Sequence, residues 1–501
     1  MSELYEKLRP HIERQFALNS ALTLYSWDNE TLAPKGAMEN TAKIIGTLSA
    51  QAYQALVNDE VRTLLTSLKE PKEFDVLNSV EQSIVKKLNK SFDRLEKIPA
   101  NEYREYSELT AKAGSIWAKA KTENDFAAFA PSLKEIVSYQ KKFAAYTKKP
   151  EMSLYDAMLD ENEEGILTRE LDIFFEKIKE TVVPLLKKVV AKNDTVNKDY
   201  NSRHFPVERQ KEFCHFLAEY IGFDFNRGVT AESAHPFTTN LHNHDVRITN
   251  HFHENNLESA MFSVIHEGGH ALYELGVDDA LTLTPVGGGT SMGVHESQSR
   301  FYENILGRSE AFWKPLFEKL KENYPEVLPD VDLKDFIRGI NKAEPGPIRT
   351  EADELTYPLH IIIRYEIEKM LMEDLISVDE LPRIWNEKYK EYLGVTPKND
   401  TEGVLQDVHW SGGAFGYFPS YAIGNAVAAQ IYAYMHNEVN VKECLEKGNL
   451  VPIREYLREH IHCFGSTKNM NELLIAMTGE PLNAEYYTKY LTEKYTKLYL
   501  E

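Results

Sequence analysis

The chain has 501 residues, of which 42% are hydrophobic, 11% aromatic and 27% charged. This mixture is typical of a globular protein with a large core, and it excludes a disordered tail, a collagen-like repeat and a disulfide-stapled miniprotein. The 57 basic and 78 acidic residues give a net charge of −21, so phosphate backbones repel the chain and no nucleic-acid partner is expected.

The cysteines and the lengths of the hydrophobic runs indicate the cellular compartment of the protein. Cys214, Cys444 and Cys463 are widely spaced and form no CxxC pair, which suggests no disulfide framework and fits a reducing cytoplasm. No run of eighteen apolar residues is present, and the first residues lack the apolar core of a secretion signal. We therefore expect a soluble, cytoplasmic protein without a membrane partner.

The first two hundred residues show helical periodicity. Hydrophobic residues recur every three or four positions between 77 and 95, and again between 103 and 117, with Pro99 between the two segments. Each series forms an apolar stripe along one helix, and the first helix is expected to stop near Pro99. No Ser/Gly-rich linker divides the chain. We expect residues 1–501 to form a single, mostly α-helical unit with two lobes.

The pattern changes between about 230 and 300. The segment 245–249 alternates polar and apolar residues, which predicts a strand. Its polar face, with Asp245, Arg247 and Thr249, suits the wall of a polar cleft and an ordinary half-solvated edge strand equally well. The run Gly287–Gly289 predicts a flexible loop, and it lacks the lysine-bearing pattern of a phosphate-binding loop.

The strongest chemical signal is His266-Glu-Gly-Gly-His270, inside Leu257–Leu275, a segment typical of a helix with Asn256 as its N-cap. Positions i and i+4 lie on one face of a helix, so the two imidazoles can bind one tetrahedral zinc ion. Glu267 is turned by about 100° and can reach a water at the metal without ligating it. The two glycines weaken a helix by about 1 kcal/mol each, which indicates close packing or close approach of a substrate.

A catalytic zinc site has three protein ligands and one open position. Glu296 follows His270 across the glycine loop, and a helix that begins near Ser291 would present it to the first helix. The neighbouring His295 could compete for this role, but an acid on the next helix is the thermolysin-like arrangement, so we prefer Glu296. Other histidines lack helical ligand spacing, and we expect surface or core roles for His242, His244, His251 and His253.

Six short signatures occur in order along the chain. They are His235-Pro-Phe237, Asp245-x-Arg247-x-Thr249, His266-Glu267-x-x-His270, His295-Glu-Ser-Gln298, Ile348-Arg349-x-x-Ala352-Asp353 and Gly403-x-x-Gln406-Asp407-x-His409-Trp410. With all six intact, the chain resembles the thermostable metallocarboxypeptidase family typified by carboxypeptidase Taq over essentially its whole length.

The resemblance implies a mostly α-helical, two-lobed zincin metallopeptidase with a deep central groove and a small β-sheet near the active site. Residues 1–200 would form one wall of the groove, and residues 201–501 the catalytic part. It also implies a homodimer that removes single residues from peptide C-termini with broad specificity, proline being a poor C-terminal residue. Zinc is the usual metal, held by His266, His270 and Glu296, and Co²⁺ can substitute for it.

The resemblance also implies catalytic roles. Glu267 matches the family's catalytic base. The oxyanion of the reaction needs donors besides the metal, and His409 and a nearby tyrosine are candidates. Related helical oligopeptidases place a tyrosine twelve residues beyond the equivalent histidine, which favours Tyr421 over Tyr417. Simple packing is the alternative role for either tyrosine.

An enzyme that acts on C-termini must bind a free carboxylate, and the planar fork of arginine does this best. Arg349 precedes Thr350, a predicted N-cap, so it projects from a loop at a helix start, a site suited to anions. In the family this arginine resembles the C-terminus anchor; an Arg349–Asp353 ion pair that holds the loop is the alternative. Arg247 is a second candidate anchor, and its strand could also bind substrate by edge addition. The predicted substrate-binding set further contains His235 and Asp245.

Two alternatives to a zinc carboxypeptidase stay open at this point. One is a zinc endo-oligopeptidase of the same fold, which would cut peptides irrespective of a free C-terminus. The other is a non-catalytic, acidic helical binding protein that retains a zincin-like helix. The intact Glu267 argues against the second alternative, because a protein without activity has no need of the base.

Overall fold

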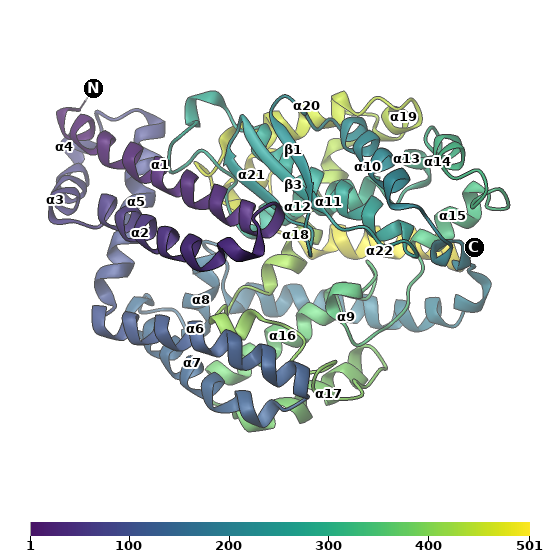
Figure 1. Ribbon diagram of the computed structural model, residues 1–501, viewed down its shortest axis with the longest axis horizontal. Helices are drawn as coiled ribbons and strands as arrows, with labels where there is room; N and C mark the ends of the chain where they lie inside the picture. Colours follow the sequence, from purple (N-terminus) through teal and green to yellow (C-terminus); the bar gives the residue numbers. More distant parts are fainter. Residues whose placement is uncertain (1) are drawn as a thin grey trace.

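The structure is a computed structural model that describes residues 2–501, and α-helices dominate it (Figure 1). The expectation of a mostly α-helical protein is confirmed. The two predicted apolar stripes lie on α5 (Ser79–Lys97) and α6 (Ala100–Glu123), and Pro99 separates these helices. Within residues 2–501, no helix combines the length and hydrophobicity needed to cross a bilayer.

The first five helices lie together at the upper left of Figure 1. They are α1 (Glu3–Thr31), α2 (Met38–Leu56), α3 (Asp59–Leu68), α4 (Pro71–Phe74) and α5. Their apolar faces bury a small core of their own, which includes Leu8, Leu65 and Leu88 and to which Val286, just before the glycine run, contributes. The segment that leads into the glycine loop therefore packs against this region, as Val277 and Leu281 also belong to its core.

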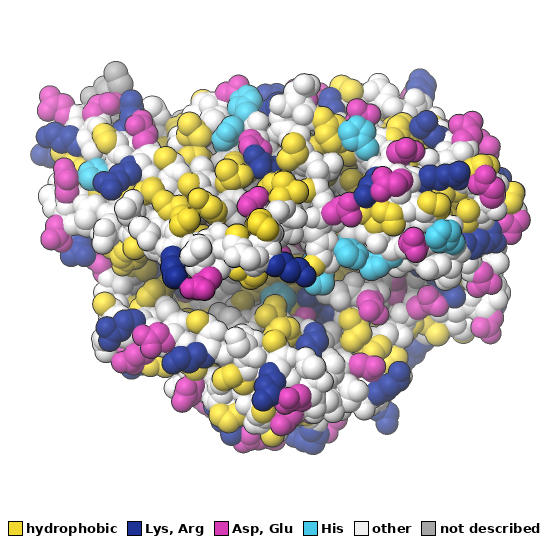
Figure 2. All heavy atoms as spheres, viewed as in Figure 1, with side chains coloured by type: hydrophobic (Ala, Val, Ile, Leu, Met, Phe, Trp, Pro, Cys, Tyr) yellow, Lys and Arg dark blue, Asp and Glu magenta, His cyan; other side chains and the backbone are white. Residues whose placement is uncertain are grey.

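The other helices share one large hydrophobic core. The lower half of Figure 1 contains α6, α7 (Phe126–Thr147), α8 (Leu154–Asn162), α9 (Thr168–Val190), α16 (Tyr357–Met372) and α17 (Leu381–Tyr392). The remaining helices are α10 (Val207–Ile221), α11 (Leu257–Leu275), α12 (Met292–Arg300), α13 (Glu310–Trp313), α14 (Phe317–Asn323), α15 (Leu333–Ile340), α18 (Pro419–Met435), α19 (Val441–Glu446), α20 (Val451–His460), α21 (Met470–Thr478) and α22 (Ala484–Tyr499). Figure 2 shows a hollow across the face between the upper and lower halves, with histidine side chains inside it.

A three-stranded sheet lies beside α11. Its strands are β1 (Gly228–Glu232), β2 (Thr238–His242) and β3 (Asp245–Asn250), in the order β1-β3-β2, with β1 parallel and β2 antiparallel to β3. The predicted strand is confirmed, and Val246 and Ile248, which alternate with Asp245 and Arg247 along it, are buried. The idea that this strand adds a substrate at its edge is wrong, because β3 is central and both of its edges are already paired.

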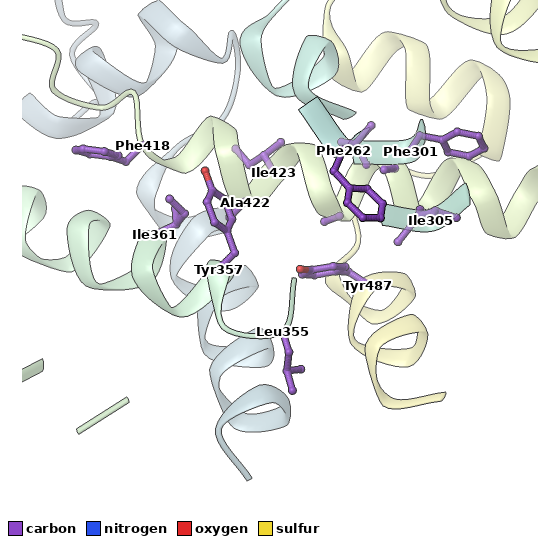
Figure 3. Close-up of a cluster of buried hydrophobic side chains, with 14 of the residues drawn as sticks. Phe262, Phe301, Ile305, Leu355, Tyr357, Ile361, Phe418, Ala422, Ile423 and Tyr487 are labelled. Atoms are coloured by element: carbon purple, nitrogen blue, oxygen red, sulfur yellow. The ribbon is translucent and has the colours of Figure 1, made fainter. Parts of the chain in front are cut away.

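An apolar cluster joins five helical segments close to the signature helices (Figure 3). The labelled side chains come from α11, the π-helical turn Phe301–Leu306 that continues α12, and the helices α16, α18 and α22 with the residues leading into them; they are Phe262, Phe301, Ile305, Leu355, Tyr357, Ile361, Phe418, Ala422, Ile423 and Tyr487. Segments far apart in the sequence are thus locked together around α11 and α12 by burial of apolar surface.

Candidate active site

Two helices bring three possible metal ligands together. Helix α11 carries His266 and His270 one turn apart, and α12 carries Glu296. Oε2 of Glu296 lies 3.7 Å from Nε2 of His266 and 3.4 Å from Nε2 of His270. Ligand atoms at about 2.0–2.1 Å from a tetrahedral zinc ion lie roughly 3.3–3.4 Å apart, so the two distances to Glu296 are close to those of a zinc site. Among residues 2–501 no other group of three such side chains converges in this way.

The glycines of the motif let α11 pack closely on two sides. A Cβ atom on Gly269 would lie 2.7 Å from the carbonyl oxygen of Gln298 and 2.7 Å from Cα of Ser299, both in α12. A Cβ atom on Gly268 would lie 2.3 Å from Cδ1 of Ile221 in α10. Of the two explanations that the sequence left open for these glycines, close packing is therefore confirmed.

A buried network of charged side chains lies behind the three candidate ligands. Oε2 of Glu303 lies 2.9 Å from Nδ1 of His266. Arg300 donates to Oε1 of Glu296 at 2.7 Å and to Oε2 of Glu303 at 3.1 Å. Glu303 lies in the π-helical turn Phe301–Leu306, directly after α12. Through Glu303, the network ties His266 to Arg300, the same arginine that binds Glu296.

The charges of this network suit a metal cation. Burial would raise the pKa of Glu296, but Arg300 and both histidines outweigh it and hold the pKa far below its usual value. Glu303 is likewise kept ionised, chiefly by Arg300. Burial lowers the pKa of His270 to about 3, so this histidine is neutral. Burial would lower the pKa of His266, but Glu296 and Glu303 outweigh it and raise the pKa, so metal binding at this ring competes with protonation.

The predicted base, Glu267, is buried against the sheet. Thr238 of β2 donates its hydroxyl proton to Oε2 of Glu267 at 2.6 Å and lies 3.0 Å from the backbone carbonyl of the same residue. Burial raises the pKa of Glu267, although His266 and Thr238 partly oppose the shift. A carboxylate with a raised pKa is a stronger base near neutral pH.

The predicted oxyanion donors are neighbours. Nε2 of His409 lies 3.3 Å from the hydroxyl of Tyr421, which is in the first turn of α18. Burial lowers the pKa of His409 to about 4 and raises that of Tyr421 well above its usual value, so both are neutral near pH 7. The ring of Tyr417 lies 5.4 Å from that of Tyr421, and the two tyrosines therefore border the same space.

Arg349 is buried in a network of its own. Nε and Nη2 each lie 3.0 Å from Oδ1 of Asp407, and Nη1 donates to the hydroxyl of Tyr357 at 3.3 Å. Arg364, which is fully buried, donates through Nε to the other oxygen of Asp407 at 2.7 Å. The Arg349–Asp353 ion pair weighed as an alternative is wrong, because Asp407 is the partner of Arg349.

Asp353 instead shapes the start of α16. Its Oδ1 accepts hydrogen bonds from the backbone N–H groups of Leu355 and Thr356, at 2.9 and 3.0 Å. The helix expected to begin after Thr350 is only a short 3₁₀ turn, Arg349–Glu351, and α16 begins at Tyr357. Arg349 was predicted to lie at the start of a helix, but it lies in the 3₁₀ turn, and a short loop separates this turn from α16.

The remaining predicted substrate-binding residues lie elsewhere. Arg247 pairs with Asp245 through two hydrogen bonds of 2.8 Å, and its guanidinium lies 4.8 Å from the ring centre of Trp27 in α1. Thr238, which contacts Glu267, points from the opposite face of the sheet. The side chain of His235 is exposed in the turn before β2. The structure therefore does not bring these three predicted residues to the ligand group.

His295 is also outside the ligand group, although it lies close to it. Its Nδ1 is 2.6 Å from Nδ1 of His270, and its Nε2 is 2.7 Å from Oε1 of Glu274. Both ring nitrogens are thus occupied. The four histidines expected to have surface or core roles are not part of the group either: His242, His244, His251 and His253.

Comparison with known proteins places the whole chain in one family. Residues 7–495 match the family described as carboxypeptidase Taq (M32) metallopeptidase. The chain belongs to this family. It is 43% identical to carboxypeptidase 1 of Bacillus subtilis over 483 residues, 96% of each chain, and 36% identical to thermostable carboxypeptidase 1 of Pyrococcus furiosus over 503 residues, 99% of each chain. It is also similar to the crystal structure of an M32 carboxypeptidase from Deinococcus radiodurans, with a TM-score of 0.95 and 34% identity, covering 99% of this chain and 100% of that one.

As a member of the M32 family, the protein is an enzyme, a metallocarboxypeptidase. The resemblance drawn from the six signatures is confirmed, and both the endo-oligopeptidase and the non-catalytic binding protein are set aside.

The M32 family implies a metal ion, and the donor set fits one. Nδ1 of His266 is bound to Glu303 and Nδ1 of His270 to His295, so Nε2 is the nitrogen left free in each ring. Those two nitrogens are the atoms that face Oε2 of Glu296. Two imidazoles and one carboxylate, with a fourth position open, are typical of catalytic zinc sites.

Four residues that contact this M32 site were not among the predicted ones. Arg300 and Glu303 follow Glu296 by four and seven positions, the spacing of one helix face, and this signal was present in the sequence. Thr238 and Asp407 carried no comparable local signal, although Asp407 belongs to one of the six signatures. Their roles depend on contacts between segments distant in the chain.

Proposed function

We propose that this enzyme removes single residues from peptide C-termini with broad specificity, proline being a poor C-terminal residue, and that its metal is zinc, for which Co²⁺ can substitute. The convergence of His266, His270 and Glu296 beside the buried Glu267 carries the proposal. His266, His270 and Glu296 would hold the zinc ion, which would supply Lewis acidity and would lower the pKa of a bound water to about 7.

Glu267 is the proposed general base. Its raised pKa suits it to accept a proton from the attacking water and then to deliver that proton to the leaving amine. Thr238 occupies Oε2 of Glu267, which leaves Oε1 for the water. The hydrogen bond also fixes the rotamer of the carboxylate, and so the direction in which the proton moves.

His409 and Tyr421 are the proposed donors to the oxyanion. The tyrosine stays protonated because burial raises its pKa, and the neutral histidine has one ring proton to donate. A donor positioned at the developing oxyanion is worth about 3–4 kcal/mol in the transition state. The closeness of the two side chains supports a shared role, with Tyr417 as the neighbouring alternative to Tyr421.

Arg349 is the proposed anchor for the substrate's C-terminal carboxylate. Arg349 and Arg364 share the single carboxylate of Asp407, so one positive charge of this buried network lacks a counterion within it. Asp407 does stay charged, because the two arginines outweigh burial and lower its pKa to about 2. An incoming carboxylate would balance the excess charge. Arg247 lacks this advantage, since Asp245 already pairs with it one to one.

Mass spectrometry of a mixed peptide digest tests the proposal. Each peptide is supplied with a free and with an amidated C-terminus, and the enzyme is used as purified, after chelation, and after addition of zinc. We expect sequential loss of C-terminal residues from the free acids alone, abolished by chelation and restored by zinc. Internal cleavage, equal trimming of the amides, or full activity after complete removal of metal would refute it.

We also propose that the enzyme is a homodimer that uses α1 and α2 as its contact. Figure 2 shows hydrophobic side chains exposed over these helices, and the strongly exposed ones include Leu24, Leu32, Met38, Ile44 and Tyr53. Adjacent exposed apolar side chains are typical of interaction surfaces. Analytical ultracentrifugation should show a dimer that Leu32→Asp combined with Met38→Asp converts to a monomer.

The proposed setting is the cytoplasm, with peptides as the only substrates and without a nucleic-acid or membrane partner. Among residues 2–501 the three cysteines are free thiols, which is the state favoured in a reducing compartment. The net charge of −21 opposes binding to polyanions. Cell fractionation with an antibody against the chain tests the compartment. Retention of the protein on immobilised DNA would contradict the proposed absence of a nucleic-acid partner.

A further inference from the structure

A row of three side chains extends behind His270, away from Glu296. Nδ1 of His270 lies 2.6 Å from Nδ1 of His295, and Nε2 of His295 lies 2.7 Å from Oε1 of Glu274. His270 and Glu274 come from α11, whereas His295 comes from α12, so the row crosses the contact between the two helices. Glu274 is buried, and the side chains of both histidines are less than one-fifth exposed.

Counting protons along the row gives one arrangement. Glu274, as a carboxylate, only accepts, so His295 donates through Nε2 and its proton is on that atom. In a neutral imidazole the other nitrogen carries a lone pair, so Nδ1 of His295 accepts a hydrogen bond from the N–H at Nδ1 of His270. This leaves Nε2 of His270 with a free lone pair, directed at the ligand group. The opposite arrangement would place a proton on Nε2 of His270 and block metal binding.

The far end of the row is itself held in place. Oε1 of Glu274 also accepts from the backbone N–H of Gly289 at 3.1 Å, and Oε2 accepts from Nδ2 of Asn240 in β2. A Cβ atom on Gly289 would lie 2.8 Å from Cδ2 of His295 and 2.8 Å from Cε1 of Tyr273. The glycine loop therefore closes directly over the row, and only a residue without a side chain fits there.

The two histidine ligands are supported in different ways. Glu303 contacts His266 directly, and this carboxylate is tied to two arginines, Arg300 and Arg308. His270 reaches its carboxylate, Glu274, only through the imidazole of His295. A second-layer partner of this kind sets both the orientation of a ligand ring and which nitrogen bears the proton.

We propose that His295 and Glu274 are positioning residues that hold His270 in the tautomer and orientation that bind the metal, and that the loop Gly287–Gly289 keeps them in register. This inference rests on the proposed metal centre of His266, His270 and Glu296. It also explains why His295, next in sequence to a ligand, is not one: both of its nitrogens are used within the row.

Metal affinity measured on the metal-free full chain tests the inference, with Zn²⁺ titrated against a chromophoric chelator. His295→Ala removes the acceptor for His270 and should weaken Zn²⁺ binding about 10–100-fold, as for other second-layer partners. His295→Asn places Oδ1 where Nδ1 was, so it should recover most of the affinity. His295→Gln places its polar group further out, near Glu274, and should stay weak. His215→Ala, at an exposed histidine of α10, is the matched control and should bind like the wild type.

Glu274→Gln keeps the shape of the row and removes its charge. The new amide oxygen can still accept from His295. The new NH₂ group takes the place of Oε2, which accepts from Nδ2 of Asn240, so the amide of Asn240 has to flip to present its Oδ1, an atom without a hydrogen-bond partner among the described residues. We expect weaker Zn²⁺ binding and, in the Co²⁺-loaded protein, a changed visible absorption spectrum, because the ring of His270 is held less firmly. Should a His295 variant fail to fold, judged by circular dichroism, this substitution decides the question.

The results distinguish failure of the proposed metal centre from failure of the positioning role of His295 and Glu274. A wild-type chain that binds no metal refutes the proposed metal centre itself. A wild type that binds Zn²⁺, together with His295→Ala and Glu274→Gln variants that bind it within about twofold of the wild type, leaves the centre intact and overturns the positioning role. Equal losses in His295→Ala and His295→Asn also overturn it, since the acceptor would then be irrelevant.

Discussion

The substitution Gly269→Ala tests whether the metal centre depends on the close contact between α11 and α12. Two effects oppose each other in this variant. Alanine in place of glycine favours a helix interior by about 1 kcal/mol. The new methyl group, however, would lie 2.7 Å from the backbone oxygen of Gln298 and from Cα of Ser299. Both are main-chain atoms of α12, which cannot turn aside as a side chain can.

The magnitude follows from that overlap. Non-bonded carbon atoms sit at roughly 3.5–4.0 Å, so α12 has to move away from α11 by several tenths of an ångström or more. Overpacking of a core costs typically 1–3 kcal/mol, which cancels or exceeds the helical gain, so we expect a net loss of about 0–2 kcal/mol in the free energy of unfolding. Glu296 moves with α12, and metal sites tolerate ligand distances only within about 0.2 Å. Zn²⁺ affinity should therefore fall along with stability.

The assay compares three alanine substitutions. Urea unfolding of the metal-free chain gives stability, and competition with a chelator gives Zn²⁺ affinity. Gly114 lies in α6 with nothing within 4 Å of the added methyl group, so Gly114→Ala should gain up to about 1 kcal/mol and bind metal normally. Gly268→Ala meets only the side-chain tip of Ile221, which can rotate, so its effects should lie between those of Gly114→Ala and Gly269→Ala. A Gly269→Ala variant that is as stable as Gly114→Ala and binds Zn²⁺ as tightly would refute the reasoning.

Three further predictions concern the reaction and its pH dependence. Glu267→Gln should keep the metal, measured by atomic absorption, and lower kcat about 100–10,000-fold; turnover at the wild-type rate would exclude the base. Arg349→Lys should lower kcat/KM for free-acid peptides about 10–100-fold and erase the preference over amides, and an unchanged preference would point to another anchor. Burial raises the pKa of Glu368 to about 7, above its unfolded value, so ionising it removes about 3 kcal/mol of stability as pH rises from about 4.5 to beyond 7. Glu368→Gln should flatten that fall in urea midpoints, and an unchanged slope would contradict the shift.

The sequence predicted the elements whose signals are local. Asn256 was expected to cap the first signature helix, and its side chain does accept from the backbone of Ser259 at the start of α11. Ser291 was expected to start the second, and it caps α12 in the same way. A cap, an apolar stripe and an i, i+4 pair are all contained within a few turns of one helix, so a single sequence is enough to find them.

Groups that act across the fold could not be found in this way. Arg349 was weighed as a partner of Asp353, four residues on, but it pairs with Asp407, whose separation of 58 residues no helical spacing can indicate. Thr238 reaches Glu267 because β2 pairs with β3 in one particular register, and a shift of one residue would turn its side chain to the other face. Such contacts are decided by how segments pack, which one sequence without relatives does not reveal.

The metal motif contains both kinds of feature, those that the local sequence reveals and those that only the packing decides. His266 and His270 determine that two imidazoles share a helix face, but a motif does not determine which nitrogen of each ring is free. That choice depends on Glu303 and His295, which are 37 and 25 residues away from the histidines they contact. The glycine run, predicted only as a flexible loop, contributes to the same choice by closing over His295. The short motif therefore identifies which residues can bind a metal ion. Which nitrogen of each histidine is free to bind it depends on contacts that only the folded chain makes.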